Sequence, residues 1–261
     1  MEEMTRSVVL ISFLGVLLVI QNIIKFSFGS STVNIFCNER ERQALLTFKQ
    51  HLQDPCNHLS SWDDDTAAGD CCRWNGVVCN NKTHDQSVVV TQLQLGRLGL
   101  RGELNPSLLE LKHLNYLDLS LNDFNISIPP FLGSLHKLRF LDLAGDGNFV
   151  GMIPSQLGNL SSLRHLDMFG SELLNAGDDL EWLSHLSSLE YLDLSYVNLS
   201  KASSSSSSSS NWLHSINMLP SLLELHLSQC DLRSIPSDFS LAYLIYLTII
   251  FRNQFQKLLV T

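Results

Sequence analysis

Leu114-Asn-Tyr-Leu117-Asp-Leu119 decides the fold, because the same spacing of apolar residues returns five more times along the chain. Written as L-x-x-L-x-L, the pattern recurs at Val90–Leu95, Leu138–Leu143, Leu163–Met168, Leu189–Leu194 and Leu222–Leu227. Five of the six copies have a further leucine three residues earlier, at Leu111, Leu135, Leu160, Leu186 and Leu219. Self-similarity of this kind predicts a repeat protein.

The period of the repeat is nearly constant. The middle apolar residues lie at positions 93, 117, 141, 166, 192 and 225, so the steps are 24, 24, 25, 26 and 33 residues. The last step contains the eight serines of residues 203–210, and 33 minus 8 is 25. We therefore interpret the serine run as a flexible, solvated loop inserted into an ordinary repeat, because serine buries too little apolar area to offset the entropy of ordering.

Each repeat has a short stretch of period 2 followed by a looser return segment, in which Ile128-Pro129, Ile153-Pro154 and Ile235-Pro236 recur. One repeat cannot bury its leucines alone, but stacked repeats pair their strands at about 4.8 Å and form a continuous core. We predict an α/β solenoid, right-handed and curved, with a parallel sheet on its concave face. The leucines serve packing only.

The repeats have defined boundaries. About six of them occupy residues 86–240, and residues 241–261 are interpreted as a degenerate or truncated seventh repeat in which Leu244 and Leu247 keep the rhythm. The apolar run from Phe239 to Phe251 is shorter than the roughly 20 residues that a membrane span needs.

The first 30 residues are expected to be a signal peptide. Arg6 precedes the apolar run from Val8 to Ile20, and small residues follow at Gly29 and Ser30. An uncleaved signal anchor is the alternative. Under either interpretation the rest of the chain enters the secretory pathway.

The charge of the chain and the motifs it lacks exclude several classes of function. The formal charge of −9 argues against binding to nucleic acid or to an anionic membrane, both of which favour a basic surface. The chain lacks G-x-S-x-G, H-E-x-x-H, P-loop and kinase motifs, and its nine histidines share no ligand spacing. We expect no enzyme, no cofactor and no metal.

A cap is expected at residues 31–85, because a solenoid exposes its core at each end. Asn38 is a candidate helix N-cap, and Trp62 and Trp74 offer apolar area toward the first repeat. The apolar face of the helix consists of Ala44, Leu45, Phe48 and Leu52.

Five of the six cysteines, Cys37, Cys56, Cys71, Cys72 and Cys79, lie in this cap and predict disulfides. A zinc site built from Cys71, Cys72, Cys79 and His84 is the alternative, although no C-x-x-C pair is present. Cys230 lies in a repeat and is expected to be a buried, reduced thiol.

Four glycosylation sequons begin at Asn81, Asn125, Asn159 and Asn198.

Three cap segments, Glu41–Lys49, Leu59–Trp62 and Cys71–Cys79, closely resemble the plant leucine-rich-repeat N-terminal domain. The repeats resemble the plant extracellular type, as Gly151-Met-Ile153-Pro154 illustrates. Further segments are similar to receptor-like proteins of the disease-resistance class: Glu181–Ser184, Val197–Ala202 and Met218–Leu222. The likeness covers about residues 37–240.

The resemblance implies a cell-surface receptor with a long ectodomain, one transmembrane helix and a short tail, which signals through partner kinases. It also implies disulfides Cys37–Cys71 and Cys72–Cys79. Three departures stand out: Cys56 has no evident partner, the chain stops after about six repeats without anchor, tail or C-terminal cap, and the asparagine ladder is kept only at Asn122. The equivalent ladder positions hold Leu98, Asp146, Ser171, Val197 and Cys230.

The outward strand positions predict two columns. One consists of Gln92, Tyr116, Phe140, His165, Tyr191 and Glu224, and the other of Gln94, Asp118, Asp142, Asp167, Asp193 and His226. Aromatic rings beside carboxylates favour a neutral or basic peptide or protein surface. The alternative is that Leu-Asp-Leu belongs to the framework of this repeat type whether or not a ligand binds. The candidate ligand-binding residues are Tyr116, Asp118, Phe140, Asp142, His165, Asp167, Tyr191 and Asp193.

The function expected from residues and resemblance is extracellular ligand binding by part of a receptor-like protein in plant defence, at the cell surface or secreted. A soluble inhibitor of a cell-wall-degrading enzyme such as a polygalacturonase is one alternative, and a non-functional truncated receptor fragment is another. In receptors of this kind, ligand and partner-kinase contacts often lie on later repeats.

Overall fold

The computed structural model describes residues 37–63, 70–81, 88–145, 147–177, 179–202, 212–232 and 248–250. The chain divides into two compact units, Met1–Ile35 and Phe36–Thr261, and every described residue belongs to the second. The predicted signal peptide, the serine insertion and, apart from residues 248–250, the segment 241–261 lie outside the described residues. Within the described ranges, no helix is long and apolar enough to cross a membrane.

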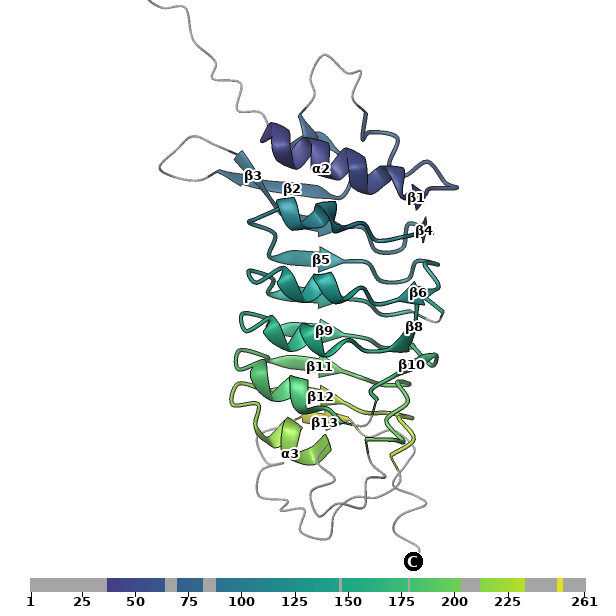
Figure 1. The fold of residues 1–261 in the computed structure, drawn as a ribbon, viewed down its shortest axis with the longest axis vertical. Coiled ribbons are helices and arrows are strands. Elements are labelled where there is room, and N and C mark those ends of the chain that lie inside the picture. The colour runs from purple at the N-terminus through teal and green to yellow at the C-terminus, as the bar shows by residue number, and fades with distance from the viewer. Residues whose placement is uncertain are drawn as a thin grey trace, which may run out of the picture. The chain divides into compact units, whose positions relative to one another are not determined.

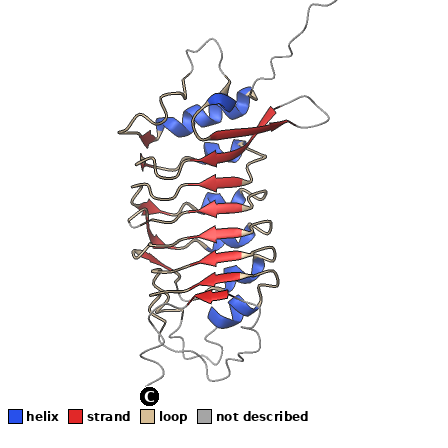
Figure 2. Cartoon of the chain, turned by 180° about the vertical axis from the view of Figure 1, so that it is seen from behind, coloured by secondary structure: helices blue, strands red, loops and turns tan. Residues whose placement is uncertain are grey.

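One eight-stranded sheet runs through the described part of the second unit (Figures 1 and 2). Neighbouring strands are parallel except for the first two, which form an antiparallel pair. In spatial order the strands are β2 (Val77–Asn81), β3 (Val88–Gln94), β5 (Tyr116–Asp118), β7 (Phe140–Asp142), β9 (His165–Asp167), β11 (Tyr191–Asp193), β12 (Glu224–His226) and β13 (Thr248–Ile250).

The register of this sheet follows the repeat. Leu93 pairs with Leu117, and the pairing continues through the middle leucines of β7, β9, β11 and β12. β13 extends the sheet and places Ile249 beside Leu225, a step of 24 residues. The predicted solenoid with a parallel sheet is confirmed.

Short helices cover the opposite side of the repeats, as a comparison of Figures 1 and 2 shows. They are the 3-10 helices η2 (Pro106–Glu110), η3 (Pro130–Ser134), η4 (Ser155–Asn159) and η5 (Glu181–His185), followed by the α-helix α3 (Trp212–Asn217). Each 3-10 helix buries one leucine, for example Leu108 in η2 and Leu132 in η3. Gly133 and Gly158 let neighbouring turns approach closely, since a Cβ at either position would clash with the backbone of Gln156 or Trp182.

A second, three-stranded parallel sheet connects the return segments. It consists of β6 (Ile126–Ser127), β8 (Phe149–Met152) and β10 (Leu174–Asn175), and a single bridge from Asn175 to Asn198 continues it. This sheet satisfies backbone groups of the return segments themselves.

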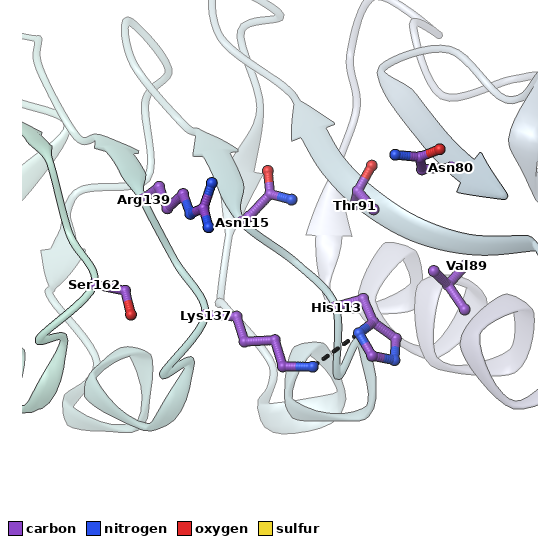
Figure 3. Close-up of a pocket in the computed structure, with 8 residues that line it drawn as sticks. All are labelled: Asn80, Val89, Thr91, His113, Asn115, Lys137, Arg139 and Ser162. Carbon is purple, nitrogen blue, oxygen red and sulfur yellow. Dashed lines mark hydrogen bonds between the residues drawn. The ribbon is translucent and has the colours of Figure 1, made fainter. Parts of the chain in front are cut away.

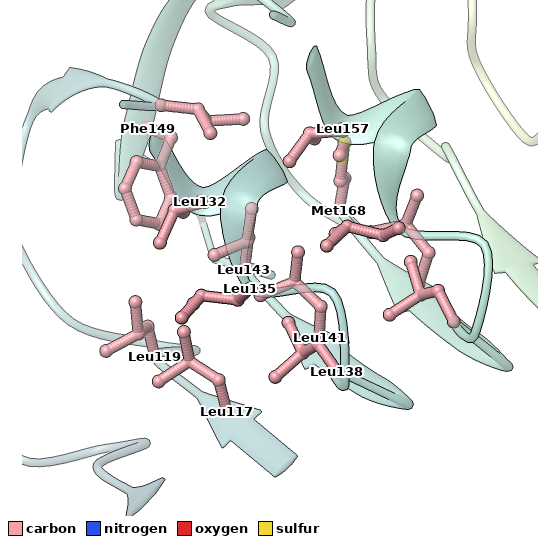
Figure 4. Packing of buried hydrophobic residues seen from close by; sticks show 14 of the residues in the cluster. Leu117, Leu119, Leu132, Leu135, Leu138, Leu141, Leu143, Phe149, Leu157 and Met168 are labelled. Carbon is pink, nitrogen blue, oxygen red and sulfur yellow. The ribbon is translucent and has the colours of Figure 1, made fainter. Parts of the chain in front are cut away.

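The core is continuous from the cap to β12. Every apolar residue of the six L-x-x-L-x-L copies is buried, and the most exposed of them, Leu222, reaches only 7%. Figure 4 shows how leucines from successive strands interdigitate with those of η3 and η4. Leu119, Leu143 and Met168 are completely enclosed. The interpretation of these residues as packing residues is confirmed.

The cap begins with α2 (Glu39–Gln50), whose first turn is capped by Asn38: its side chain accepts a hydrogen bond from Arg40 N at 2.9 Å. Ala44, Leu45 and Phe48 are buried as predicted. The expectation that Leu52 extends this helical face is wrong, because the helix ends at Gln50. Leu52 lies instead in β1 (Leu52–Gln53), which pairs with β4 (Arg101–Gly102) and ties the cap to the first repeat.

A buried carboxylate makes a second connection between cap and repeats. Glu41 is only 4% exposed, and its Oε2 accepts a hydrogen bond from Val90 N in β3 at 2.8 Å. The rings of Trp62 and Trp74 are both buried and stack on each other, with their centroids 5.6 Å apart. Trp62 Nε1 donates to the carbonyl of Asn75 at 2.8 Å, so this large side chain is satisfied as well as buried.

The cap contains two disulfides, Cys37–Cys71 and Cys72–Cys79, the pairing that the resemblance implies. Disulfide sulfurs are not thiolates, so this pairing contradicts the alternative of a zinc site, whose fourth candidate, His84, lies outside the described residues. Cys230 is a buried free thiol, as expected, and Cys56 is an exposed free thiol.

An asparagine ladder supports the turns that follow the strands. Asn122 Nδ2 donates to the carbonyls of Leu95 and Leu119 at 2.8 and 2.9 Å, and its Oδ1 accepts from the backbone N–H groups of Leu98 and Leu100. The expectation that only Asn122 keeps this role is wrong. In the next repeat Asn148 donates to the carbonyl of Leu119 at 2.9 Å, and Asp146, the residue selected from the sequence, lies outside the described residues.

Cys230 provides the donor part of this role: its Sγ donates to the carbonyl of Leu194 at 3.0 Å. Asn148 was missed because the turn before it is longer by two residues, so it lies seven positions after its middle leucine whereas Asn122 lies five after its own. Counting a fixed offset from the leucine therefore selected the wrong residue.

We predict that Asn122→Ala lowers the free energy of unfolding by about 2–4 kcal/mol, because it leaves several buried backbone groups without partners. Urea denaturation of the secreted protein measures this. The control is Asn105→Ala at the start of η2, where loss of the cap to Ser107 N should cost about 0.5–1 kcal/mol. Equal costs for the two variants would contradict a special role for Asn122.

We also predict that reduction unfolds the cap before the repeats, since a disulfide typically contributes about 2–4 kcal/mol. Hydrogen exchange of the backbone in α2 and in β5 to β9 measures the two regions separately. A cap that stays as protected in dithiothreitol as without it would show that its packing alone is sufficient.

Candidate functional site on the strand face

Four aromatic side chains form a ladder across β5, β7, β9 and β11. Tyr116, Phe140, His165 and Tyr191 occupy equivalent strand positions, and each pairs in register with the next. Their ring centroids are 4.1, 4.2 and 4.2 Å apart, with interplanar angles of 7, 5 and 10°. We call these four residues the ring ladder. Its faces are used in mutual stacking, so the half-buried rings present their edges to a ligand.

Four aspartates run beside the ring ladder, two positions further along the same strands. Asp118, Asp142, Asp167 and Asp193 pair in register, and we call them the carboxylate row. Both predicted columns are therefore present in the sheet.

Each aspartate of the carboxylate row also has a structural role that sequence reasoning missed. The Oδ1 of each residue accepts a hydrogen bond from the backbone N–H two positions later, for example from Ser120 at 2.9 Å and from Ser195 at 2.7 Å. The equivalent bonds reach Ala144 and Phe169. The turns beyond contain residues with positive φ, such as Leu121 and Tyr196. The carboxylates thus fix the turns that end the strands.

Burial changes the protonation of the middle of this face. Desolvation raises the pKa of Asp167 to about 7, although the hydrogen bond from Phe169 opposes the rise and the neighbouring Asp142 and Asp193 add to it. Desolvation also raises the pKa of Asp142. It lowers the pKa of His165, which favours the neutral ring within the ladder. The site can therefore change its charge near neutral pH.

The two columns end in polar pairs. On the cap side, Gln94 Nε2 donates to Gln92 Oε1 at 2.9 Å. At the far end, His226 Nε2 lies 2.7 Å from Glu224 Oε1, and His226 Nδ1 lies 4.0 Å from an Asp193 oxygen. The His226 ring is tilted by 41° against Tyr191, so the parallel stacking stops there.

Three of the four predicted glycosylation sequons, at Asn125, Asn159 and Asn198, lie away from the strand face. Asn125 and Asn159 are exposed, the former just before β6 and the latter at the end of η4. Asn198 is also exposed and lies beyond β11, beside the second sheet. The side chain of Asn81 lies outside the described residues. Glycans at the three described positions would leave the ring ladder accessible.

We predict that Asp167→Asn stabilises the protein more at pH 7.5 than at pH 5. The folded-state pKa of about 7 lies above the ordinary value of 3.8, so between these values the folded protein holds a proton that the unfolded chain has released. This contribution to stability is present at low pH and is lost as the pH rises through about 7.

Thermal unfolding at both pH values measures the effect, with an expected gain of about 2–4 °C at pH 7.5. Asp167→Ala is the control, because it also removes the hydrogen bond to Phe169 and should lose stability at both pH values. Identical midpoints for Asp167→Asn and the unaltered protein at pH 7.5 would rule out the raised pKa.

Comparison with known proteins identifies the family. The family model described as "Leucine rich repeat N-terminal domain" matches residues 38–80, and "Leucine Rich Repeat" matches residues 113–135. The chain is 41% identical over 227 residues to receptor-like protein EIX1 of Solanum lycopersicum, which covers 83% of this chain and 21% of that protein. The chain thus spans about a fifth of the length of this relative.

Solved structures of Arabidopsis receptors share the fold. The ectodomain of the receptor kinase HAESA, in complex with an IDA peptide hormone, superposes with a TM-score of 0.64 and 28% identity, covering 82% of this chain and 33% of that one. The BIR3–SERK2 complex from Arabidopsis thaliana matches with a TM-score of 0.52 and 34% identity, covering 60% of this chain and 81% of that one. The chain belongs to the plant leucine-rich-repeat receptor-like proteins, with their N-terminal domain at residues 38–80 and their repeats stacked on it.

Proposed function

We propose that this chain is an extracellular, glycosylated, ligand-binding segment of a receptor-like protein that acts in plant defence at the cell surface. The name of the relative EIX1 as a receptor-like protein supports the receptor role. The disulfide-bonded cap supports passage through the secretory pathway, since structural disulfides form in oxidising compartments.

The observation that carries this proposal is the juxtaposition of the ring ladder and the carboxylate row. Aromatic side chains contribute large contact areas at low entropic cost, and they are enriched among the residues that dominate binding energy. A row of carboxylates beside them favours a ligand with neutral or basic groups. This combination fits a peptide or a protein surface that carries lysine or arginine next to flat apolar side chains.

The kind of ligand and partner is proposed from the relatives. The HAESA structure contains a peptide hormone, and the BIR3 structure contains SERK2. We propose that this protein likewise binds a peptide or protein ligand and signals with a receptor kinase. We propose no catalytic role for this chain. The aspartates of the carboxylate row form the turns after the strands and, in this proposal, contact the ligand.

The test replaces ring-ladder residues and measures peptide binding. Peptides selected from a random display library on the full chain should be rich in basic and aromatic residues. The double variant Phe140→Ala, Tyr191→Ala should weaken their binding by about tenfold or more, because each truncated aromatic contact of this kind costs about 1–2 kcal/mol.

Phe169→Ala is the matched control. Phe169 is an exposed aromatic residue that lies beyond the end of β9 and touches Tyr196 edge to face, outside the ring ladder. Its replacement should leave affinity unchanged. If the double variant folds and binds the selected peptides as well as the unaltered protein, the ring ladder is scaffold and the ligand site lies elsewhere.

A further inference from the structure

A polar groove crosses the sheet at the edge where the strands begin (Figure 3). Its volume is about 310 Å³, and it extends from the cap hairpin β2–β3 to Ser162, which lies before β9. Two rows of side chains line it. Asn80, Thr91, Asn115 and Arg139 lie along the strands, and His113 and Lys137 lie on the turns that precede β5 and β7. We call this site the strand-start groove.

The charge of the strand-start groove is opposite to that of the whole chain. The chain has a formal charge of −9, but both charged residues that line the groove, Lys137 and Arg139, are cationic. Neither has an ion-pair partner among the described residues. The equivalent position one repeat later provides a contrast: Arg164 Nη1 lies 3.0 Å from Glu190 Oε1 and is neutralised. The groove therefore concentrates positive charge that no described acidic residue neutralises.

Hydrogen-bond geometry orients this charge toward the groove. Lys137 Nζ lies 2.9 Å from His113 Nδ1. An ammonium group can only donate, so Nδ1 is the acceptor and a neutral His113 ring carries its proton on Nε2. The amide side chains of Asn80 and Asn115 make no hydrogen bond to another described residue; Asn115 lies beside the Arg139 guanidinium, and Asn80 lies at the cap end of the same row. Lysine, arginine and amide N–H donors thus converge on one groove.

The position of the groove relates it to the ring ladder. Asn115 immediately precedes Tyr116 and Arg139 immediately precedes Phe140. Along each of these strands the order is thus a polar or cationic group, a ring and a carboxylate. In the third repeat the order is Lys137, Arg139, Phe140 and Asp142. At β7 the strand face is therefore electrically polarised, with cations where the strand begins and a carboxylate where it ends.

We propose that the strand-start groove binds the carboxylate groups of an acidic segment in the peptide ligand, an inference that rests on the proposed function. If one part of a peptide lies over the rings of Tyr116 and Phe140, the adjacent residues of the same peptide reach the strand-start groove. Guanidinium and ammonium groups bind carboxylates through charge-assisted hydrogen bonds. A peptide also carries apolar side chains for the adjoining rings, which a chain of uronic acid sugars lacks. The polarity of the face then fixes the orientation of a ligand of mixed charge.

The experiment measures binding of an acetylated, amidated hexaglutamate peptide to the full chain at low salt. The double variant Lys137→Gln, Arg139→Gln should weaken binding by about tenfold or more. Arg164→Gln is the matched control, because it removes an arginine at the equivalent position whose charge is already paired, and it should change affinity by less than about twofold. Circular dichroism verifies that each exposed substitution leaves the fold intact.

Three outcomes would overturn the proposal: no binding of hexaglutamate by the unaltered protein, equal losses in the double variant and in Arg164→Gln, or groove-dependent binding of hexagalacturonate in place of hexaglutamate. The last result would assign the groove to an acidic polysaccharide. A separate arm uses Phe140→Ala, Tyr191→Ala, which should still bind hexaglutamate because the probe has no aromatic group. Retained binding there supports the groove even if the ring ladder proves to be scaffold, so the two proposals fail independently.

Discussion

Burial of the strand leucines between the main sheet and the return helices is the constraint on which the rest of this structure depends. A strand of three residues cannot be stable alone, and one repeat cannot enclose its own leucines. Stacking solves both problems at once, but only in one register, because a shift of one residue would turn the leucines toward solvent. The outward residues are thus aligned from repeat to repeat by a packing requirement that has nothing to do with their own chemistry.

This alignment explains why the surface is organised in columns. Once the leucines are in register, Tyr116 faces Phe140 and Asp118 faces Asp142 without any further specification. Selection for function then needs to change only the outward residues of single repeats. Because the leucines alone fix the register, the outward residues can be changed without loss of the fold. One column can therefore contact a ligand, the next can form the turns, and the edge before the strands can carry the opposite charge.

The parts that could be predicted are those governed by this spacing or by a familiar motif. The columns, the buried leucines and the cap helix followed from local periodicity, and the disulfide partners followed from the resemblance. The misses arose where spacing is not conserved or where contacts are distant in sequence. Asn148 lies in a lengthened turn. Leu52 fits the helical spacing of the residues before it, but it lies in a strand whose partner is about 50 residues away. Glu41 bonds to Val90 across 49 residues, which no local pattern reveals. The strand-start groove could not be predicted, because Arg139 becomes a neighbour of Asn115, and Lys137 a neighbour of His113, only after the repeats stack.

The ring ladder has a mechanical consequence. Adjacent strands in a sheet lie about 4.7–4.9 Å apart, whereas the ring centroids lie only 4.1–4.2 Å apart. Repeats are therefore closer together at the level of the rings than at the level of the backbone, which makes the strand face the inner side of the bend. Nearly parallel rings at this separation are close to van der Waals contact, so further bending would force them into one another. The ring ladder thus limits the curvature of the solenoid. A strand face without such rings would have no equivalent lower limit on its radius of curvature.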